Sequence, residues 1–156
     1  MSQIVARTSW LRGVVMGLDD GLVTTLVTIM TVSSIAGTQL FRTMVGVVLA
    51  SAISMTLGGY ASARASGDGN AITQGLQTGG AFLVGGLAPL LPVALHLSGV
   101  QWWSYGATAL VSLMFGWLKV RYGQHVHGHW LKEALFFLAI VTAGTLAGVV
   151  IGWLLP

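Results

Sequence analysis

Two adjacent carboxylates, Asp19 and Asp20, lie inside the first long apolar stretch of the sequence. An ionised carboxylate in hydrocarbon costs several kcal/mol unless it is paired, hydrated or bound to a ligand. Carboxylate oxygens bind divalent cations, and they also take up and release protons. The pair is therefore the first candidate for metal or proton chemistry in this chain.

Polar side chains continue from Asp20 along the same predicted helix. At about 100° per residue, a face about 80° wide carries Asp20, Thr24, Thr28 and Thr31, with Met16 just beside it. One interpretation is a hydrophilic face that lines an ion path, with a hard carboxylate near its cytoplasmic end. The other is that the threonines bond to their own helix backbone while Asp20 pairs with Arg12 or reaches the headgroups.

The length of this span favours a position of Asp20 inside the membrane. A span that started after Asp20 would keep about 16 residues before Gly37, whereas one that starts near Val14 keeps about 23. Asp19 points about 100° away from Asp20 and turns more easily to water, a headgroup or an arginine.

The next predicted span places Met55 among small and hydroxyl side chains. One face of that helix carries Ser51, Met55, Gly58, Gly59, Ser62 and Ser66. The thioether of Met55 could bind a transition metal. Alternatively, Met55 fills space and the glycines let another helix approach.

Three imidazoles, His125, His127 and His129, alternate along the longest polar interruption of the sequence. They could gather Zn²⁺, Ni²⁺ or Fe²⁺, or they could fall together by chance in a short loop. The chain has no cysteine, so thiolate metal sites and disulfides are excluded. It also has no phosphate-binding loop after a strand and no Ser/His/Asp arrangement, so we expect no enzyme activity and no tightly bound cofactor.

The composition indicates that these residues sit in an integral membrane protein. The chain has 156 residues, of which 54% are hydrophobic and only 7% charged. Each crossing of the bilayer needs about 20 apolar residues, and five such spans are predicted at about 14–36, 42–64, 72–97, 102–120 and 132–155. The sequence thus predicts an all-α protein with one transmembrane domain, residues 1–156, surrounded by the lipid bilayer.

The basic residues predict the orientation of these spans. With a cytoplasmic N-terminus, six of the seven lysines and arginines fall on the cytoplasmic side and only Arg42 falls outside. The first 13 residues lack the order of a cleaved signal peptide, and Trp10 between two arginines indicates an interfacial segment. The net charge of +3 comes from the ends of the spans, so we expect no nucleic acid partner.

Three segments in these spans are similar to motifs of a known family. Residues 17–25 (GLDDGLVTT), 54–62 (SMTLGGYAS) and 85–92 (GGLAPLLP) lie in the first, second and third predicted spans. The chain resembles the vacuolar iron transporter family, whose motifs at these places are close to G-x-N-D-G-[I/L]-V-[S/T]-T, S-M-A-x-G-E-Y-x-S and G-G-x-x-P-L-x-P. Asp19 replaces the usual asparagine of the first motif.

The resemblance implies a homodimer of five-helix chains with a cytoplasmic N-terminus. It also implies proton-coupled movement of Fe²⁺ or Mn²⁺ out of the cytosol, along a path lined by the first two spans of both protomers. Asp20 and Met55 match the family's metal-contacting positions, with Asp19 as an added carboxylate. The predicted path is lined by Thr24, Thr28, Thr31, Ser51, Gly59 and Ser62.

The chain departs from the family pattern in two places. Gly59 stands where the family has glutamate, and the glutamate-rich cytoplasmic segment that usually follows the second span is missing. The leading hypothesis is a proton-coupled metal exporter of a bacterial inner membrane. The departures motivate an alternative, a non-transporting scaffold or subunit of a larger membrane complex. A third hypothesis is a metal sensor or store that uses His125, His127 and His129.

Overall fold

The computed structural model describes residues 2–32, 37–122 and 130–154, and these form five α-helices. The helices are α1 (Ser2–Thr31), α2 (Gly37–Ala65), α3 (Ala71–Ala94), α4 (Val100–Tyr122) and α5 (Trp130–Leu154). The described residues contain no β-strand, which confirms the prediction of an all-α chain. The predicted start of the first span, residue 14, lies well inside α1.

Four of the described helices are long and apolar enough to cross a membrane. They contain the candidate spans Gly13–Thr31, Thr38–Ala65, Ala71–Ala94 and Ala134–Leu154. A multi-pass membrane protein is therefore confirmed. α4 is not among these candidates, so the count of five spans stays a prediction.

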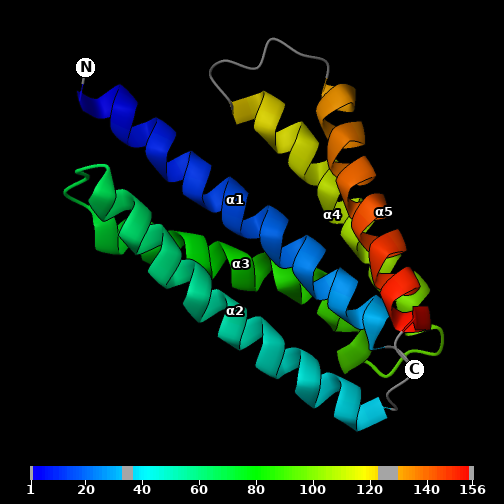
Figure 1. The fold of residues 1–156 in the computed structure, drawn as a ribbon. Coiled ribbons are helices and arrows are strands. Elements are labelled where there is room, and N and C mark those ends of the chain that lie inside the picture. The colour runs from blue at the N-terminus through cyan, green and yellow to red at the C-terminus, as the bar shows by residue number, and fades with distance from the viewer. Residues whose placement is uncertain (1, 33–36, 123–129, 155–156) are drawn as a thin grey trace.

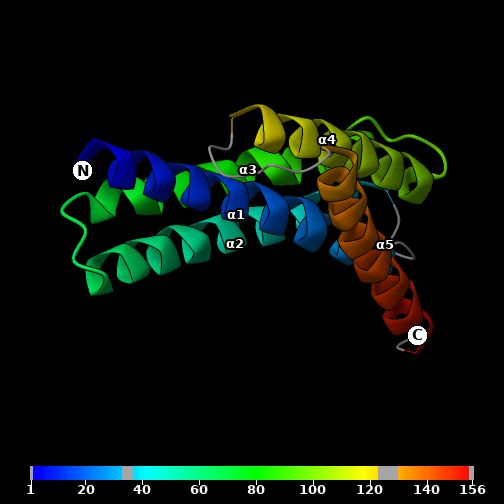
Figure 2. The same ribbon diagram turned by 90° about the horizontal axis from the view of Figure 1, so that it is seen from above.

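α3 lies between α1 and α2 (Figure 1). α1 and α3 run parallel, since Gly17 of α1 lies against Thr78 and Gly21 lies against Phe82. α2 runs antiparallel to α3. α4 packs on α3 and α5, and α5 crosses α1, where Gly144, Gly148 and Gly152 of α5 lie against the C-terminal part of α1 (Figure 2).

Glycines bring α1 and α3 into direct backbone contact. A Cβ atom at Gly17 would overlap the carbonyl oxygen of Thr78, and one at Gly21 would overlap that of Phe82. From the other side, a Cβ atom at Gly85 would overlap the carbonyl oxygen of Leu18. Small residues spaced by four allow this approach in membranes, where packing drives helix association.

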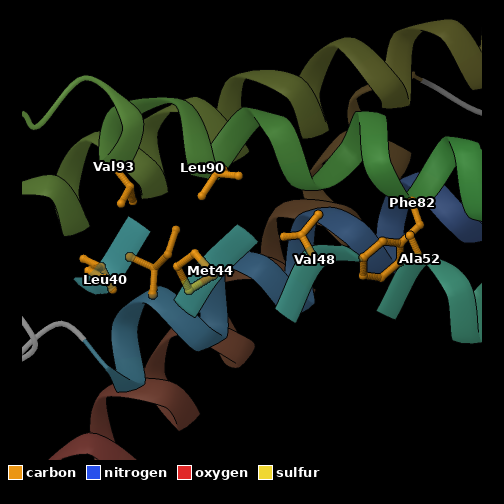
Figure 3. Close-up of a cluster of buried hydrophobic side chains, with 8 residues drawn as sticks. Leu40, Met44, Val48, Ala52, Phe82, Leu90 and Val93 are labelled. Atoms are coloured by element: carbon orange, nitrogen blue, oxygen red, sulfur yellow. The ribbon is translucent and has the colours of Figure 1, made fainter. Parts of the chain in front are cut away.

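The main apolar cluster joins α2 to α3. α2 contributes side chains spaced by four, which meet Phe82, Leu90 and Val93 of α3 (Figure 3). The α2 residues are Leu40, Met44, Val48 and Ala52. Ile29, fully buried near the end of α1, joins the same cluster. This spacing turns one stripe of α2 inward and leaves the opposite stripe exposed.

Side-chain hydrogen bonds form in the turn before α3 and between α3 and α4. Asp68 accepts hydrogen bonds from the backbone N–H of Asn70 at 2.9 Å and from Nε2 of Gln74 at 2.5 Å. Gly67 takes a positive φ of 74° in this turn, a backbone conformation that glycine favours. Near the other end, the Ser104 hydroxyl of α4 donates to the carbonyl of Pro89 at 2.8 Å.

Exposed tryptophans mark the end of the molecule that holds the C-terminus. Trp102 and Trp103 open α4, and Trp153 lies near the end of α5. All three side chains are exposed. The start of α4 and the end of α5 lie at the same end of the molecule (Figure 1). Tryptophans gather in this way at a membrane–water interface.

Candidate functional site

α1 presents four rows of side chains, each row spaced by four residues and each with a different environment. The row of Gly17, Gly21, Thr25 and Ile29 is buried and faces α3 and the main cluster. The row of Leu22, Leu26 and Met30 is also buried. The row of Val23, Val27 and Thr31 is half-buried and contacts the glycines of α5.

The fourth row is polar and is the candidate site. It consists of Met16, Asp20, Thr24 and Thr28. Met16 and Asp20 are exposed, whereas Thr24 and Thr28 are half-buried. Each of these residues comes one position before a residue of the row that faces α3. The polar face predicted from the sequence therefore runs beside the direct backbone contact between α1 and α3.

The hydroxyl group of Thr24 approaches the Asp20 carboxylate on this row. The Thr24 hydroxyl lies 3.4 Å from Oδ1 of Asp20, to which it donates. The Thr28 hydroxyl donates to the backbone carbonyl of Thr24 at 2.7 Å. The arrangement places a carboxylate and a hydroxyl on one open face, and both are oxygen ligands that divalent cations accept.

Thr31 lies outside this row, although the sequence grouped it with Asp20. Its hydroxyl is near two carbonyl oxygens, that of Val27 at 2.9 Å and that of Gly148 on α5 at 3.3 Å. Thr31 therefore lies where α1 meets α5. Its predicted role in lining a path stays a prediction.

The adjacent carboxylates of Asp19 and Asp20 have different environments. Asp20 is exposed, and Asp19 is half-buried and has an interaction partner. One residue along a helix turns a side chain by about 100°, so the two carboxylates leave α1 in different directions.

Met55 of α2 lies at a similar depth to Asp20 but packs inward. Gly13 and Gly59 both contact Thr78, which places the two glycines at one level of the bundle. Counting about 1.5 Å per residue from that level, Met55 lies about 6 Å and Asp20 about 10 Å further along the helix bundle. Met55 is half-buried and packs against the main apolar cluster. Ser51 on the same face of α2 is half-buried as well, and Ser62 is exposed.

Gly59, the position where the resemblance expects glutamate, packs against α3. A Cβ atom there would lie 2.9 Å from the hydroxyl oxygen and 3.1 Å from Cβ of Thr78, and 3.2 Å from Cα of Gly75. A longer side chain would have to displace these atoms or turn away from α3. The close approach of α2 and α3 thus accounts for a glycine at this position.

The predicted histidine cluster, His125, His127 and His129, lies outside the described residues. Among the residues that the structure describes, no three His, Cys, Asp or Glu side chains come together as a metal site. A metal ion at Asp20 would therefore take its other ligands from hydroxyls, carbonyls, thioethers, water or a second chain.

Sequence reasoning missed Thr25. Its side chain is fully buried, and its hydroxyl has no hydrogen-bond partner. A Cβ atom at Gly86 would lie 2.9 Å from this hydroxyl oxygen, so Thr25 fills the contact between α1 and α3. Thr25 follows Gly17 and Gly21 at a spacing of four, and that spacing is the signal that could have placed it on the buried row.

These features define a multi-pass α-helical membrane protein with a carboxylate inside the first candidate span. The model of the VIT family, the vacuolar iron transporters, matches residues 65–153, which is more than half of the chain. The chain therefore belongs to the VIT family, and this membership indicates metal-ion transport across a membrane. No curated protein and no solved structure matches the chain.

The matched residues lie almost entirely in α3, α4 and α5. The motifs on α1 and α2, with Asp20 and Met55, come before the matched region. The family is thus established independently of the residues proposed to bind metal.

Proposed function

We propose that the protein moves Fe²⁺ or Mn²⁺ out of the cytosol in exchange for protons, as a homodimer in a bacterial inner membrane. The observation that carries the proposal is the exposed carboxylate of Asp20 inside the first candidate span, Gly13–Thr31. The metal is the transported substrate, and no resident cofactor is needed. The distribution of lysine and arginine supports a cytosolic N-terminus.

The exposure of Asp20 supports the presence of a second copy of the chain. Asp20 follows Gly13 by seven residues and so lies about 10 Å inside the start of the span. A carboxylate that faced lipid at this depth would be strongly unfavourable. A second copy that packs on the open faces of α1 and α2 would cover it and would add a second Asp20.

Competition between a cation and a proton supplies the coupling. Both bind the same carboxylate oxygens, so uptake of a metal ion releases any proton held there. The release of the metal on the other side lets a proton return.

Met55 supplies the softer contact in this proposal. Its level on α2 is within about one helical turn of Asp20. A thioether favours transition metals over Mg²⁺ and Ca²⁺, which take oxygen ligands. Because Met55 packs on the main apolar cluster, reaching a metal ion requires its flexible side chain to change rotamer.

Flux measurements in reconstituted vesicles test the proposal. Purified protein in proteoliposomes should carry Fe²⁺ or Mn²⁺ when a proton gradient is imposed, and Asp20→Asn should abolish the flux. Asp68→Asn is the matched control, because that carboxylate lies in the turn between α2 and α3. Flux that is unchanged in Asp20→Asn would rule out this mechanism.

A non-transporting scaffold is the alternative. Gly59 favours it, because a glycine packed against Thr78 stands where the family pattern has a glutamate. A scaffold would co-purify with partner chains at fixed stoichiometry and without bound metal. A metal store that uses His125, His127 and His129 would instead lose its metal in a variant with two of these histidines changed to alanine.

A further inference from the structure

The hydroxyl of Thr24 makes a different hydrogen bond from that of most threonine hydroxyls inside the described helices. In a helix, threonine usually donates to the carbonyl four residues earlier. At donor–acceptor distances of 2.7 to 2.9 Å, this bond is made by Thr28, Thr31, Thr56, Thr78, Thr108, Thr142 and Thr145. Thr24 instead directs its hydroxyl to the side chain of Asp20, four residues earlier.

The distance between the two oxygens is close to the separation of two ligands of one cation. Thr24 Oγ1 and Asp20 Oδ1 are 3.4 Å apart, whereas O–H···O bonds have a typical length of about 2.7 to 2.8 Å. Two oxygens that each bind an octahedral cation at about 2.1 Å, at right angles, are about 3.0 Å apart. A shift of a few tenths of an ångström would bring this pair to that separation.

The neighbouring turn holds Thr24 in place. The Thr28 hydroxyl bonds to the Thr24 carbonyl at 2.7 Å, and the next residue, Thr25, is fully buried against α3. The backbone that carries Thr24 is thereby fixed, while its side chain stays half-buried on the polar row of α1 that also carries Asp20. An oxygen that is positioned before the ion arrives costs little to organise when the ion binds.

We propose that the Thr24 hydroxyl oxygen is a direct second ligand, which binds the same divalent cation as the Asp20 carboxylate. The ligand class is a divalent cation that accepts neutral and charged oxygens, such as Mn²⁺ or Fe²⁺. This inference rests on the proposed function, because it deepens the role of the Asp20 row in transport. It assigns a chemical role to a residue that the sequence predicted only to line a path.

Substitutions that keep the shape of Thr24 test this role. Thr24→Val removes the oxygen and keeps the volume, whereas Thr24→Ser keeps the oxygen. Thr145→Val on α5 is the matched control, since its hydroxyl bonds to its own helix at 2.8 Å. Mn²⁺ binding is measured from the decrease in the electron paramagnetic resonance signal of free Mn²⁺ as purified protein is added. The KM for Mn²⁺ transport is measured in proteoliposomes.

Thr24→Val should weaken Mn²⁺ binding and raise KM by about tenfold or more, as changes around metal sites commonly do. Thr24→Ser and Thr145→Val should stay close to the unmodified protein. Equal losses in Thr24→Val and Thr145→Val would overturn the inference, since the loss would not depend on the Thr24 oxygen. Unchanged Mn²⁺ affinity in Thr24→Val, with flux still abolished in Asp20→Asn, would overturn the Thr24 role and leave transport standing. Unchanged flux in Asp20→Asn would instead remove the proposed function.

Discussion

The row of α1 that faces α3 and the row that carries Asp20 are neighbours on one helix, yet they have opposite properties. Gly17 and Gly21 leave no space, because the backbone of α3 occupies the positions that a Cβ atom would take. Asp20, one residue before Gly21, is exposed. The contact with α3 fixes the rotation of α1. The buried row that faces α3, the closed row, therefore determines where the row that carries Asp20, the open row, lies on the helix.

The largest effect is expected from filling the closed row. Gly21→Ala should destabilise the protein by about 1 to 3 kcal/mol or more, because the new methyl group would overlap the Phe82 carbonyl. The midpoint of thermal unfolding in detergent measures this effect. Gly46→Ala is the control, since no atom lies within 4 Å of a Cβ atom there. Equal stability of the two variants would contradict the close packing of α1 on α3.

Neutralising the open row should change transport rather than folding. Asp20→Asn should abolish Mn²⁺ flux, a fall of about tenfold or more to the background, while the unfolding midpoint stays close to that of the unmodified protein. Flux and thermal unfolding measured on the same preparation separate these effects. A large fall in the unfolding midpoint would show that Asp20 supports the fold, and the contrast between the two rows would fail.

Thr25 carries a hydroxyl group on the closed row, and its replacement is expected to increase stability rather than reduce it. Thr25→Val should raise the free energy of unfolding by about 1 kcal/mol, because it removes a buried hydroxyl that has no partner. Thr142→Val, which removes a hydroxyl bonded to Tyr105 at 3.0 Å, should lower it. Chemical denaturation of the two variants checks the sign. A loss of stability in Thr25→Val would mean that this hydroxyl is bonded in the bilayer.

The smallest effect is expected outside α1. Ser104→Ala removes the hydrogen bond to the Pro89 carbonyl and should cost about 0.6 kcal/mol, the mean found for hydrogen bonds between membrane helices. Chemical denaturation against the unmodified protein measures the difference. A cost as large as that of Gly21→Ala would show that the contact of α3 with α4 is as critical as that of α3 with α1.

The sequence predicted the polar row well because helical phase alone determines it. Asp20, Thr24 and Thr28 fall on one face of any regular helix, and the structure keeps them there. Thr31 was grouped with them on the same basis. Its contact with Gly148 depends on where α5 crosses, which the spacing of residues within α1 does not contain.

What Gly59 and Met55 contact could not be predicted from the sequence, for the same reason. Gly59 was expected to line a path, and the structure places it against Thr78. Met55 was expected to contact metal, and it packs on the main apolar cluster. Both placements follow from how closely α2 approaches α3, which is a property of two helices together. Phase within one helix predicts which residues share a face, but it does not predict what that face meets.

The direct backbone contact between α1 and α3 has a mechanical consequence for a transport cycle. Helices separated by long side chains can slide as those side chains change rotamer, whereas Gly17, Gly21 and Gly85 offer no side chain that could adjust. α1 and α3 should therefore tilt together as one body. Any motion that opens Asp20 first to one side of the membrane and then to the other must occur at the contacts of this pair with α2, α4 and α5.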